Sequence, residues 1–211
     1  NGQEEGKIVY GVTSIIGILG KPALVNWATR LAVDKIRERS SDIPEKLEEV
    51  LKEAKYEHYK VSKEAQELGT RVHAIADRWF SEDKLGLVQE MLLVKREEER
   101  NSLSAMLEIL KTGRLERKEG ERKIYSRKNE YAVTVDFIGL LDGIPSVIDY
   151  KTSSAIYPEY FLQGAAYAGA LEEEGFSVSQ TAVIRFGKDK KLEIQIDKEW
   201  RQKLPVFLAL K

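Results

Sequence analysis

The chain has 211 residues, of which 42% are hydrophobic and 33% charged, and its formal net charge is -1, which argues against a polybasic protein but allows a local basic groove. Because it has no cysteine, disulfides, thiolate zinc sites and cysteine-ligated iron–sulfur clusters are excluded. No apolar run approaches the ~18 residues of a membrane span, and residues 1–5 have no signal-peptide character. We therefore expect a soluble, intracellular protein of the cytoplasm that has no membrane partner.

The chain up to about Gly113 carries the periodicity of helices. Apolar residues recur with helical spacing in four stretches, at 24–36, 45–59, 61–79 and 85–110. Pro22 and Pro44 stand just ahead of the first two stretches. Proline is tolerated at the first position of a helix, so both fit helix starts. The last stretch predicts one helix or two, because its middle, 95–100, is almost all charge and suits a solvated helix face or a turn.

Beyond Gly113 the pattern changes to that of an α/β core. Five stretches predict strands, at 123–126, 131–141, 146–150, 181–186 and 192–196. Two stretches predict helices, at 158–174 and 198–211. Asp142-Gly143 predicts a hairpin turn between the second and third strands. We expect one domain over 1–211, with a helical part at about 8–113 and an α/β core at about 114–211.

Three polar residues fall on the two strands that this turn joins. Side chains alternate along the first strand, which places Asp136 on the face with the smaller residues. Asp149 and Lys151 share one face of the next strand, and the turn brings Asp136 across to Asp149. Two carboxylates there suit Mg²⁺ or Mn²⁺, and a neighbouring lysine can orient or deprotonate a water or stabilise charge. An ion pair with a purely structural role is the alternative.

Two further clusters could join this site. His73 lies beside the apolar face of the 61–79 helix, where a neutral imidazole could complete a metal shell, and Asp77 one turn later could accept its other ring N–H. Gln163 and Tyr167 project from one side of a helix rich in small residues, and they could bond a phosphate or Lys151. The alternatives are a half-buried structural histidine and a core helix with incidental polar residues.

Together these pieces resemble the PD-(D/E)xK nuclease superfamily and, within it, the RecB-like exonucleases. The matching segments follow the order of that branch: Gly69–His73 for its G-T-x-x-H motif, Asp136 within Val133–Gly139 for its first acidic motif, Asp149–Thr152 for D-x-K-T, and Gln163–Tyr167 for Q-x-x-x-Y. Glu121 resembles an upstream glutamate of the branch. Val135 replaces the proline that gives the superfamily its name. The lack of cysteine resembles the cluster-free members, the phage-type and mitochondrial genome maintenance exonucleases.

The resemblance implies a restriction-endonuclease-like core, a central mixed sheet flanked by helices, behind a helical N-terminal half. It implies a metal site for Mg²⁺ or Mn²⁺, without an iron–sulfur cluster, whose ligands are His73, Asp136, Asp149 and the backbone carbonyl of Tyr150. It implies a catalytic set in which Lys151 activates water or stabilises charge and other residues support it: Lys151, Asp136, Asp149, Glu121, Gln163 and Tyr167.

We therefore expect a hydrolase of DNA phosphodiester bonds, an exonuclease that acts on single strands or duplex ends. The alternatives are a structure-specific endonuclease on the same fold and a non-catalytic DNA-binding subunit of a recombination or repair complex. Partners would be DNA and proteins of recombination, repair or viral replication. The candidate DNA contacts are Lys123, Arg127, Lys128, Arg78 and Thr152. Arg71 lies on the opposite side of its helix from His73, which favours a structural or outer-surface role.

Overall fold

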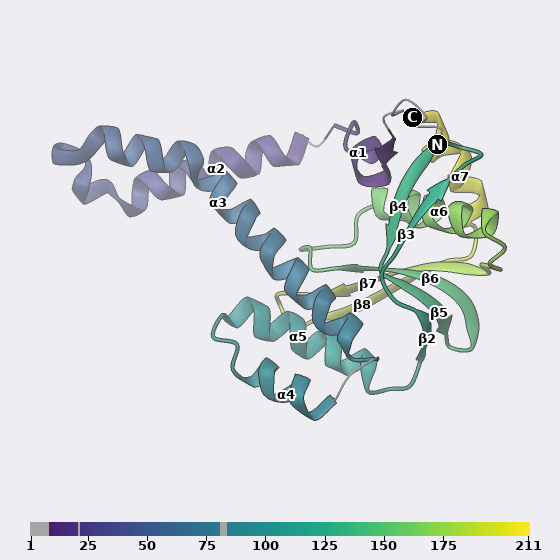
Figure 1. Cartoon of the computed structure of the whole chain (residues 1–211). Helices are drawn as coiled ribbons and strands as arrows, with labels where there is room; N and C mark the ends of the chain where they lie inside the picture. The colour runs from purple at the N-terminus through teal and green to yellow at the C-terminus, as the bar shows by residue number, and fades with distance from the viewer. Residues whose placement is uncertain (1–8, 21, 81–83) are drawn as a thin grey trace, which may run out of the picture. The chain divides into compact units, whose positions relative to one another are not determined.

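The computed structural model of the chain describes residues 9–20, 22–80 and 84–211 (Figure 1). What the sequence predicts for residues 1–5 lies outside this described part. The backbone packs as two compact units, and α3 (Ile43–Arg78) contributes residues to both. The first unit contains residues up to Ile18 and from Arg71 onward, and the second contains Leu19–Thr70.

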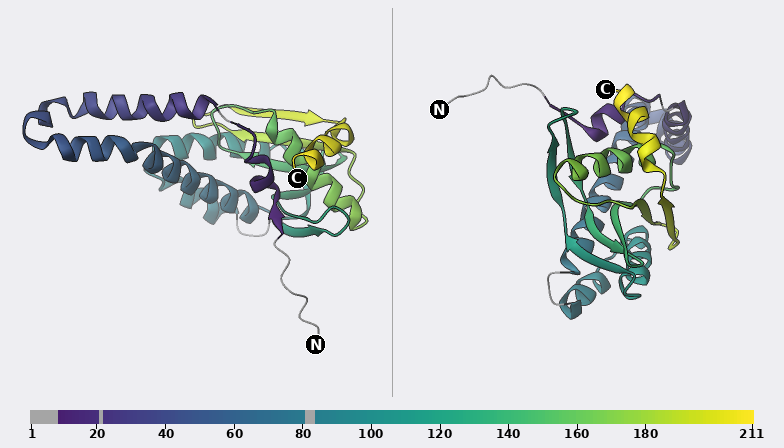
Figure 2. Two further views of the ribbon diagram at one scale, coloured as in Figure 1. Left: turned by 90° about the horizontal axis from the view of Figure 1, so that it is seen from above. Right: turned by 90° about the vertical axis from the view of Figure 1, so that its right-hand side faces the viewer.

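The second unit is helical. It contains α2 (Pro22–Glu38), the single 3-10 turn η1 (Ser40–Asp42) and the beginning of α3. Figure 2 shows α2 and this part of α3 running antiparallel. The guanidinium of Arg39, directly after α2, donates hydrogen bonds of 2.6 Å to Asp42 of η1 and to Glu53 of α3, so a charged side chain connects the turn between the two helices to α3.

The stretches 45–59 and 61–79, which the sequence predicts as helices, form the one helix α3. No glycine or proline stands at the junction between them, so nothing in the local sequence ends the first helix there. The backbone leaves helical geometry at Lys46 (φ -133°), close to the start of α3. The kink therefore follows Pro44, which occupies the second position of the helix rather than the first.

The first unit contains two sheets. The three-stranded sheet has the order β1-β4-β3, and the five-stranded sheet has the order β2-β5-β6-β7-β8, in which β6 and β7 run parallel and the other neighbours antiparallel. The strands are β1 (Tyr10–Gly11), β2 (Leu115–Glu119), β3 (Arg122–Ser126), β4 (Tyr131–Val135), β5 (Phe137–Leu141), β6 (Ile144–Lys151), β7 (Gln180–Phe186) and β8 (Leu192–Asp197). Mixed sheets with helices confirm the α/β class.

Helices cover both faces of the five-stranded sheet. The remaining helices are α1 (Val12–Ile16), α4 (Lys84–Leu92), α5 (Glu97–Leu110), α6 (Glu159–Glu173) and α7 (Trp200–Ala209). α6 packs against β6 and β7, and α5 packs against β7 and β8 on the opposite face (Figure 1). Every residue of β7 is accordingly buried.

Small residues let α6 approach its neighbours closely, as the sequence predicts. A Cβ at Gly164 would lie 3.1 Å from the Thr181 hydroxyl oxygen of β7, and one at Gly169 would lie 2.9 Å from Leu204 of α7. α6 also packs against β3 and β4, so it contacts both sheets. The core of this unit therefore forms around α6, next to the end of β6 where Lys151 lies.

The single strand predicted over 131–141 is wrong. The chain bends at Asp136, so that β4 belongs to the three-stranded sheet and β5 to the five-stranded sheet. Asp136 therefore lies between two strands and not on the face of one. The alternation of buried residues continues through Val135 and Phe137, and for that reason the sequence pattern does not show the break.

The other predicted elements are confirmed to within a few residues. Asp142 (φ 55°) and Gly143 (φ 75°) form the expected hairpin turn, and both have the positive φ that a type I′ turn requires. Two helices form over 85–110, and the charged stretch 95–100 contains the last residues of the break between them. α4 ends at Leu92, and α5 begins at Glu97. The sequence reading missed β1, α1 and β2.

None of the described helices is both long and apolar enough to cross a membrane.

Candidate functional site

The β5–β6 hairpin brings Asp136 to Asp149. Phe137 pairs with Ile148 in the antiparallel register, so Asp136, one residue before β5, comes opposite Asp149. Oδ2 of Asp136 accepts a hydrogen bond of 2.9 Å from the backbone N–H of Tyr150. This bond fixes the Asp136 carboxylate against the end of β6, which is where the predicted turn would place it.

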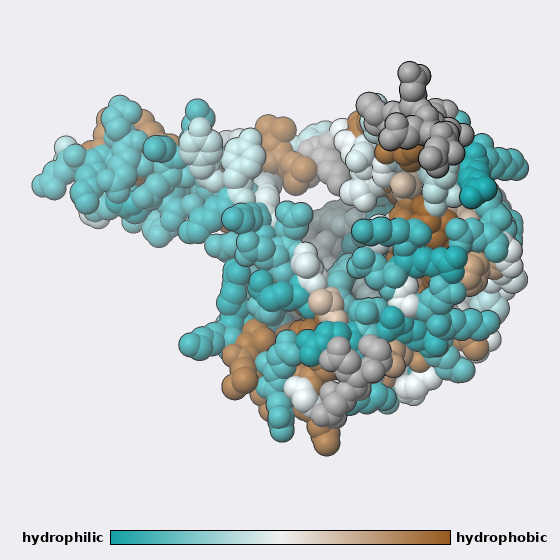
Figure 3. All heavy atoms as spheres, viewed as in Figure 1, coloured by the Kyte–Doolittle hydropathy of each residue, from teal (hydrophilic) through white to brown (hydrophobic). Residues whose placement is uncertain are grey.

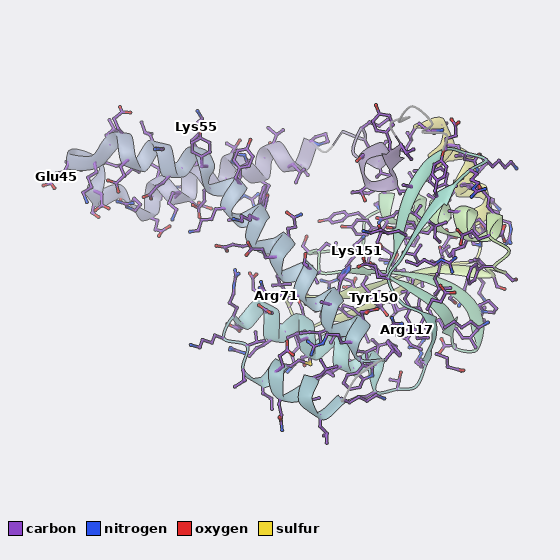
Figure 4. The ribbon with its side chains drawn as sticks, viewed as in Figure 1. Glu45, Lys55, Arg71, Arg117, Tyr150 and Lys151 are labelled. Atoms are coloured by element: carbon purple, nitrogen blue, oxygen red, sulfur yellow. The ribbon has the colours of Figure 1, made fainter. Side chains whose placement is uncertain are left out.

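Asp149 and Lys151 form a buried ion pair at the end of β6, and Figure 4 labels Lys151 there. Nζ of Lys151 lies 2.8 Å from Oδ1 and 2.7 Å from Oδ2 of Asp149. Only the contact to Oδ1 has the alignment of a hydrogen bond, so Oδ2 is buried without a hydrogen-bond partner among the described residues. Lys151 keeps its side chain 18% exposed, whereas that of Asp149 is only 3% exposed.

Burial and charge perturb both members of this pair. Burial raises the pKa of Asp149 to about 6, an effect that the Lys151 charge opposes and the Asp136 charge reinforces. Burial lowers the pKa of Lys151, but the negative charge and the hydrogen bond of Asp149 outweigh it and leave that pKa above its ordinary value. The pair therefore combines a carboxylate that is costly to bury with an ammonium group that stays charged.

His73 contributes the third side chain from α3. Its Nδ1 lies 3.3 Å from Oδ1 of Asp136, and its ring packs edge-on against that of Tyr150, with 5.9 Å between the ring centroids. Burial lowers the pKa of His73, but the hydrogen bond and the charge of Asp136 outweigh it and raise the pKa above its ordinary value. The structure thus brings His73 and Asp136 together, as the sequence predicts.

Asp77 does not accept a hydrogen bond from His73, and that expectation is wrong. Its carboxylate instead accepts a hydrogen bond of 2.6 Å from Nη2 of Arg117, which also donates to the Asp77 carbonyl through Nη1 at 2.5 Å. Arg117 lies on β2, a strand that the sequence reading missed. Because β2 was not predicted, the sequence did not indicate that Arg117 pairs with Asp77.

Two residues of α6 hold the head of Lys151. Oε1 of Gln163 accepts a hydrogen bond of 3.2 Å from Nζ of Lys151, and Nε2 of Gln163 donates to the hydroxyl of Tyr167. The ring of Tyr160 lies 4.8 Å from the same Nζ, a cation–π arrangement. Burial raises the pKa of Tyr167 well above its ordinary value, so its hydroxyl stays protonated. The sequence suggests that Gln163 bonds a phosphate or Lys151, and the structure contains the bond to Lys151.

Glu121 is not in contact with this cluster among the described residues. It is exposed in the turn between β2 and β3, and its backbone N–H donates to the Asp77 carboxylate over 3.4 Å. The predicted DNA contacts are dispersed. Lys123, Arg127 and Lys128 are exposed on β3 and the turn after it, and Thr152 is half-buried directly after Lys151.

The two arginines of α3 form ion pairs. Arg78 pairs with Glu90 of α4 at 2.9 Å, so a phosphate would have to compete with that carboxylate. Arg71 donates two hydrogen bonds, of 2.8 and 2.7 Å, to Glu99, which is only 5% exposed. This contact agrees with the structural role that the helical wheel favours for Arg71.

Sequence reasoning missed Arg185, which lies beside Lys151 in the parallel register of β6 and β7. Arg185 is only 2% exposed, donates a hydrogen bond of 3.1 Å to the carbonyl of Ser153, and pairs with Glu193 at 2.6 Å. It therefore fixes the loop that follows Lys151. An arginine next to the apolar residues 182–184 of a strand was the available signal, because such a charge is buried only with partners.

The donor chemistry of the cluster fits a divalent cation. It offers one imidazole, two carboxylates and, in Oδ2 of Asp149, a buried oxygen without a hydrogen-bond partner in the described residues. In the described parts of the chain, no group of three or more His, Cys, Asp or Glu side chains is already arranged to hold a metal ion. His73 is paired with Asp136, and Lys151 occupies the carboxylate of Asp149.

Comparison with known proteins does not assign the chain to a family. No protein-family model matches it, and no curated protein matches its sequence. The function must therefore be inferred from the arrangement of the side chains themselves.

Proposed function

We propose that the protein is a metal-dependent deoxyribonuclease, an exonuclease of the RecB-like type on a restriction-endonuclease-like core. One observation carries the proposal: four residues from three separate parts of the sequence meet at the end of β6. His73 comes from α3, Asp136 from the bend between the sheets, and Asp149 and Lys151 from β6 itself. An isolated structural ion pair would need neither the second carboxylate nor the imidazole.

A cation would be held by His73, Asp136, Asp149 and the backbone carbonyl of Tyr150. The N–H of Tyr150 donates to Asp136, and the N–H and C=O of one strand residue point to the same edge, so that carbonyl faces the side of Asp136. When bound, Mg²⁺ or Mn²⁺ would polarise a phosphoryl oxygen and lower the pKa of a water molecule. A cation would also share the charge of Oδ2 of Asp149, which lies 2.7 Å from Nζ of Lys151 without the alignment of a hydrogen bond.

Lys151 would act on the attacking water or on the charge that develops at the phosphate. Its Nζ can do so because Gln163 and Asp149 fix its position from two sides. Tyr167 in turn fixes Gln163 through its hydroxyl. Gln163 and Tyr167 would therefore be positioning residues, since they contact Lys151 directly or through each other.

A cleavage assay tests this proposal. The purified protein is incubated with end-labelled single-stranded and duplex DNA, linear and circular, in Mg²⁺, Mn²⁺ or EDTA. We expect linear DNA to be degraded with either metal and not in EDTA, and circular single strands to survive because an exonuclease needs an end. Lys151→Ala and Asp149→Ala should slow cleavage by on the order of 1000-fold, while Lys118→Ala, an exposed lysine of β2, should cleave as the wild type does.

Three outcomes would contradict parts of the proposal. DNA that stays intact with every metal would refute the nuclease. Wild-type cleavage by folded Lys151→Ala protein would refute the site. Rapid cutting of circular strands would replace the exonuclease with an endonuclease.

A further inference from the structure

A second polar surface of the first unit lies close to this site. A cavity of about 370 Å³ lies between the start of α1 and strands β3 and β4, within the size range of small-ligand pockets. Among its lining residues the charged side chain is Lys123, and no carboxylate lines it. Lys123 makes no ion pair within the described residues, so its charge is available to an anion.

The strand register assembles a distinct open face here. Lys123 pairs with Thr134, and Tyr125 pairs with Ala132, which also pairs with Gly11 of β1. These positions point away from the core, because the residues between them, such as Ile124, are buried. Tyr125 is 41% exposed, and the small residues beside it leave space for a flat group to lie against its ring.

The cavity is linked to the candidate active site by one side chain. Tyr167 lines the cavity, and its hydroxyl accepts the hydrogen bond of Gln163, whose other end accepts from Lys151. β4, which carries Thr134, also leads directly to Asp136. The cavity and the candidate active site therefore lie on either side of the buried Tyr167 side chain.

We propose that this cavity binds an unpaired nucleotide of a single-stranded DNA that extends from the active site. Tyr125 stacks on the base, Lys123 neutralises a phosphate, and the hydroxyl of Thr134 bonds the same backbone. Proteins that hold single strands without reading their sequence combine positive charge along the backbone with aromatic rings on which the bases stack. A paired base has its faces covered by its neighbours, so the ring selects single strands. The inference rests on the proposed nuclease function and names its substrate.

The test is the binding of fluorescein-labelled oligothymidylate in EDTA, measured by fluorescence anisotropy. Tyr125→Ala should weaken binding by about tenfold, whereas Tyr125→Phe, which keeps the ring, should bind as the wild type does. Lys123→Ala should reduce the slope of log affinity against log salt by about 0.7. Lys118→Ala, a matched exposed lysine on β2, should change neither quantity. Blunt duplex should bind wild type and Tyr125→Ala equally.

Stacking itself is read from 2-aminopurine placed in the same oligonucleotide, since its fluorescence is quenched when a ring stacks on it. Quenching by wild type and Tyr125→Phe, and none by Tyr125→Ala, would support the inference without relying on affinities. Wild-type binding by folded Tyr125→Ala and Lys123→Ala, or an equal loss on duplex, would overturn it. Because EDTA prevents cleavage, absence of nuclease activity would refute the proposed function separately and leave this binding result readable.

Discussion

The two units differ in what stabilises them. In the first unit, large apolar residues such as Leu141, Ile148 and Phe186 are completely buried around α6 and the five-stranded sheet. In the second unit, α2 has no buried residue. Its visible face is mostly hydrophilic (Figure 3), and the groups that connect its helices are charged, as with Arg39 and Glu53. The first unit has a large core of its own, whereas the described residues of the second bury only Val50, Ala54 and Leu68 and are joined by partly exposed ion pairs.

This difference shows that a helical pattern does not specify burial. The apolar positions of α2 follow helical spacing, yet Leu24 is 53% exposed and Val25 is 68% exposed. In α6, by contrast, all the residues from Gln163 to Leu171 are buried. The periodicity predicts that both segments are helices, but only packing against the sheets makes one of them part of a core.

Matched leucine substitutions, one in each unit, should show the largest difference in stability between the two units. Leu141→Ala removes a completely buried side chain of β5 and should lower the free energy of unfolding by about 2–5 kcal/mol. Leu51→Ala in α3 removes a side chain that is 44% exposed and should change it by about 0.5 kcal/mol or less. Urea unfolding followed by circular dichroism measures both. Equal losses would show that the second unit buries a core comparable to that of the first.

Matched arginine substitutions should show a smaller difference between the units in the free energy of unfolding that is lost. Arg71→Ala should lower the free energy of unfolding by about 1–3 kcal/mol, because Glu99 stays buried without its two hydrogen bonds. Arg39→Ala should lower the free energy of unfolding by less, and the loss should fade in high salt, since the Glu53 side chain is 40% exposed and therefore partly screened. Unfolding at low and high salt checks both. A salt-independent loss in Arg39→Ala that equals that of Arg71→Ala would contradict the comparison.

Local chemistry was enough to predict most elements of the first unit. Asp142-Gly143 predicts its turn because both residues tolerate positive φ. The bend at Asp136 could not be predicted, because the alternation of buried residues runs through it and the change of sheet depends on distant packing. β2 was missed because its sequence, LERKE, is nearly all charged, and β1 because two residues carry no periodicity.

The candidate site was predictable where short-range geometry determines it. The spacing around the hairpin predicts that Asp136 faces Asp149. The helical wheel places His73 only beside the apolar face of its helix, and the family resemblance supplies the expectation that it joins the two carboxylates. The pairing of Asp77 with Arg117 and the position of Arg185 depend on which strands become neighbours, which the sequence pattern does not specify. The roles of the Tyr150 carbonyl and of Glu121 come from the family resemblance and stay predictions.

Calorimetric titration with Mn²⁺ tests most directly whether His73, Asp136 and Asp149 form one cation site. The proposed site predicts that wild type binds the metal and that Asp136→Asn and Asp149→Asn each weaken binding by at least about tenfold. Asp42→Asn, which removes a half-buried carboxylate of the second unit that is paired with Arg39, is the matched control and should bind as the wild type does. Wild-type Mn²⁺ affinity in folded Asp136→Asn and Asp149→Asn proteins would contradict the metal site and, with it, the proposed nuclease mechanism.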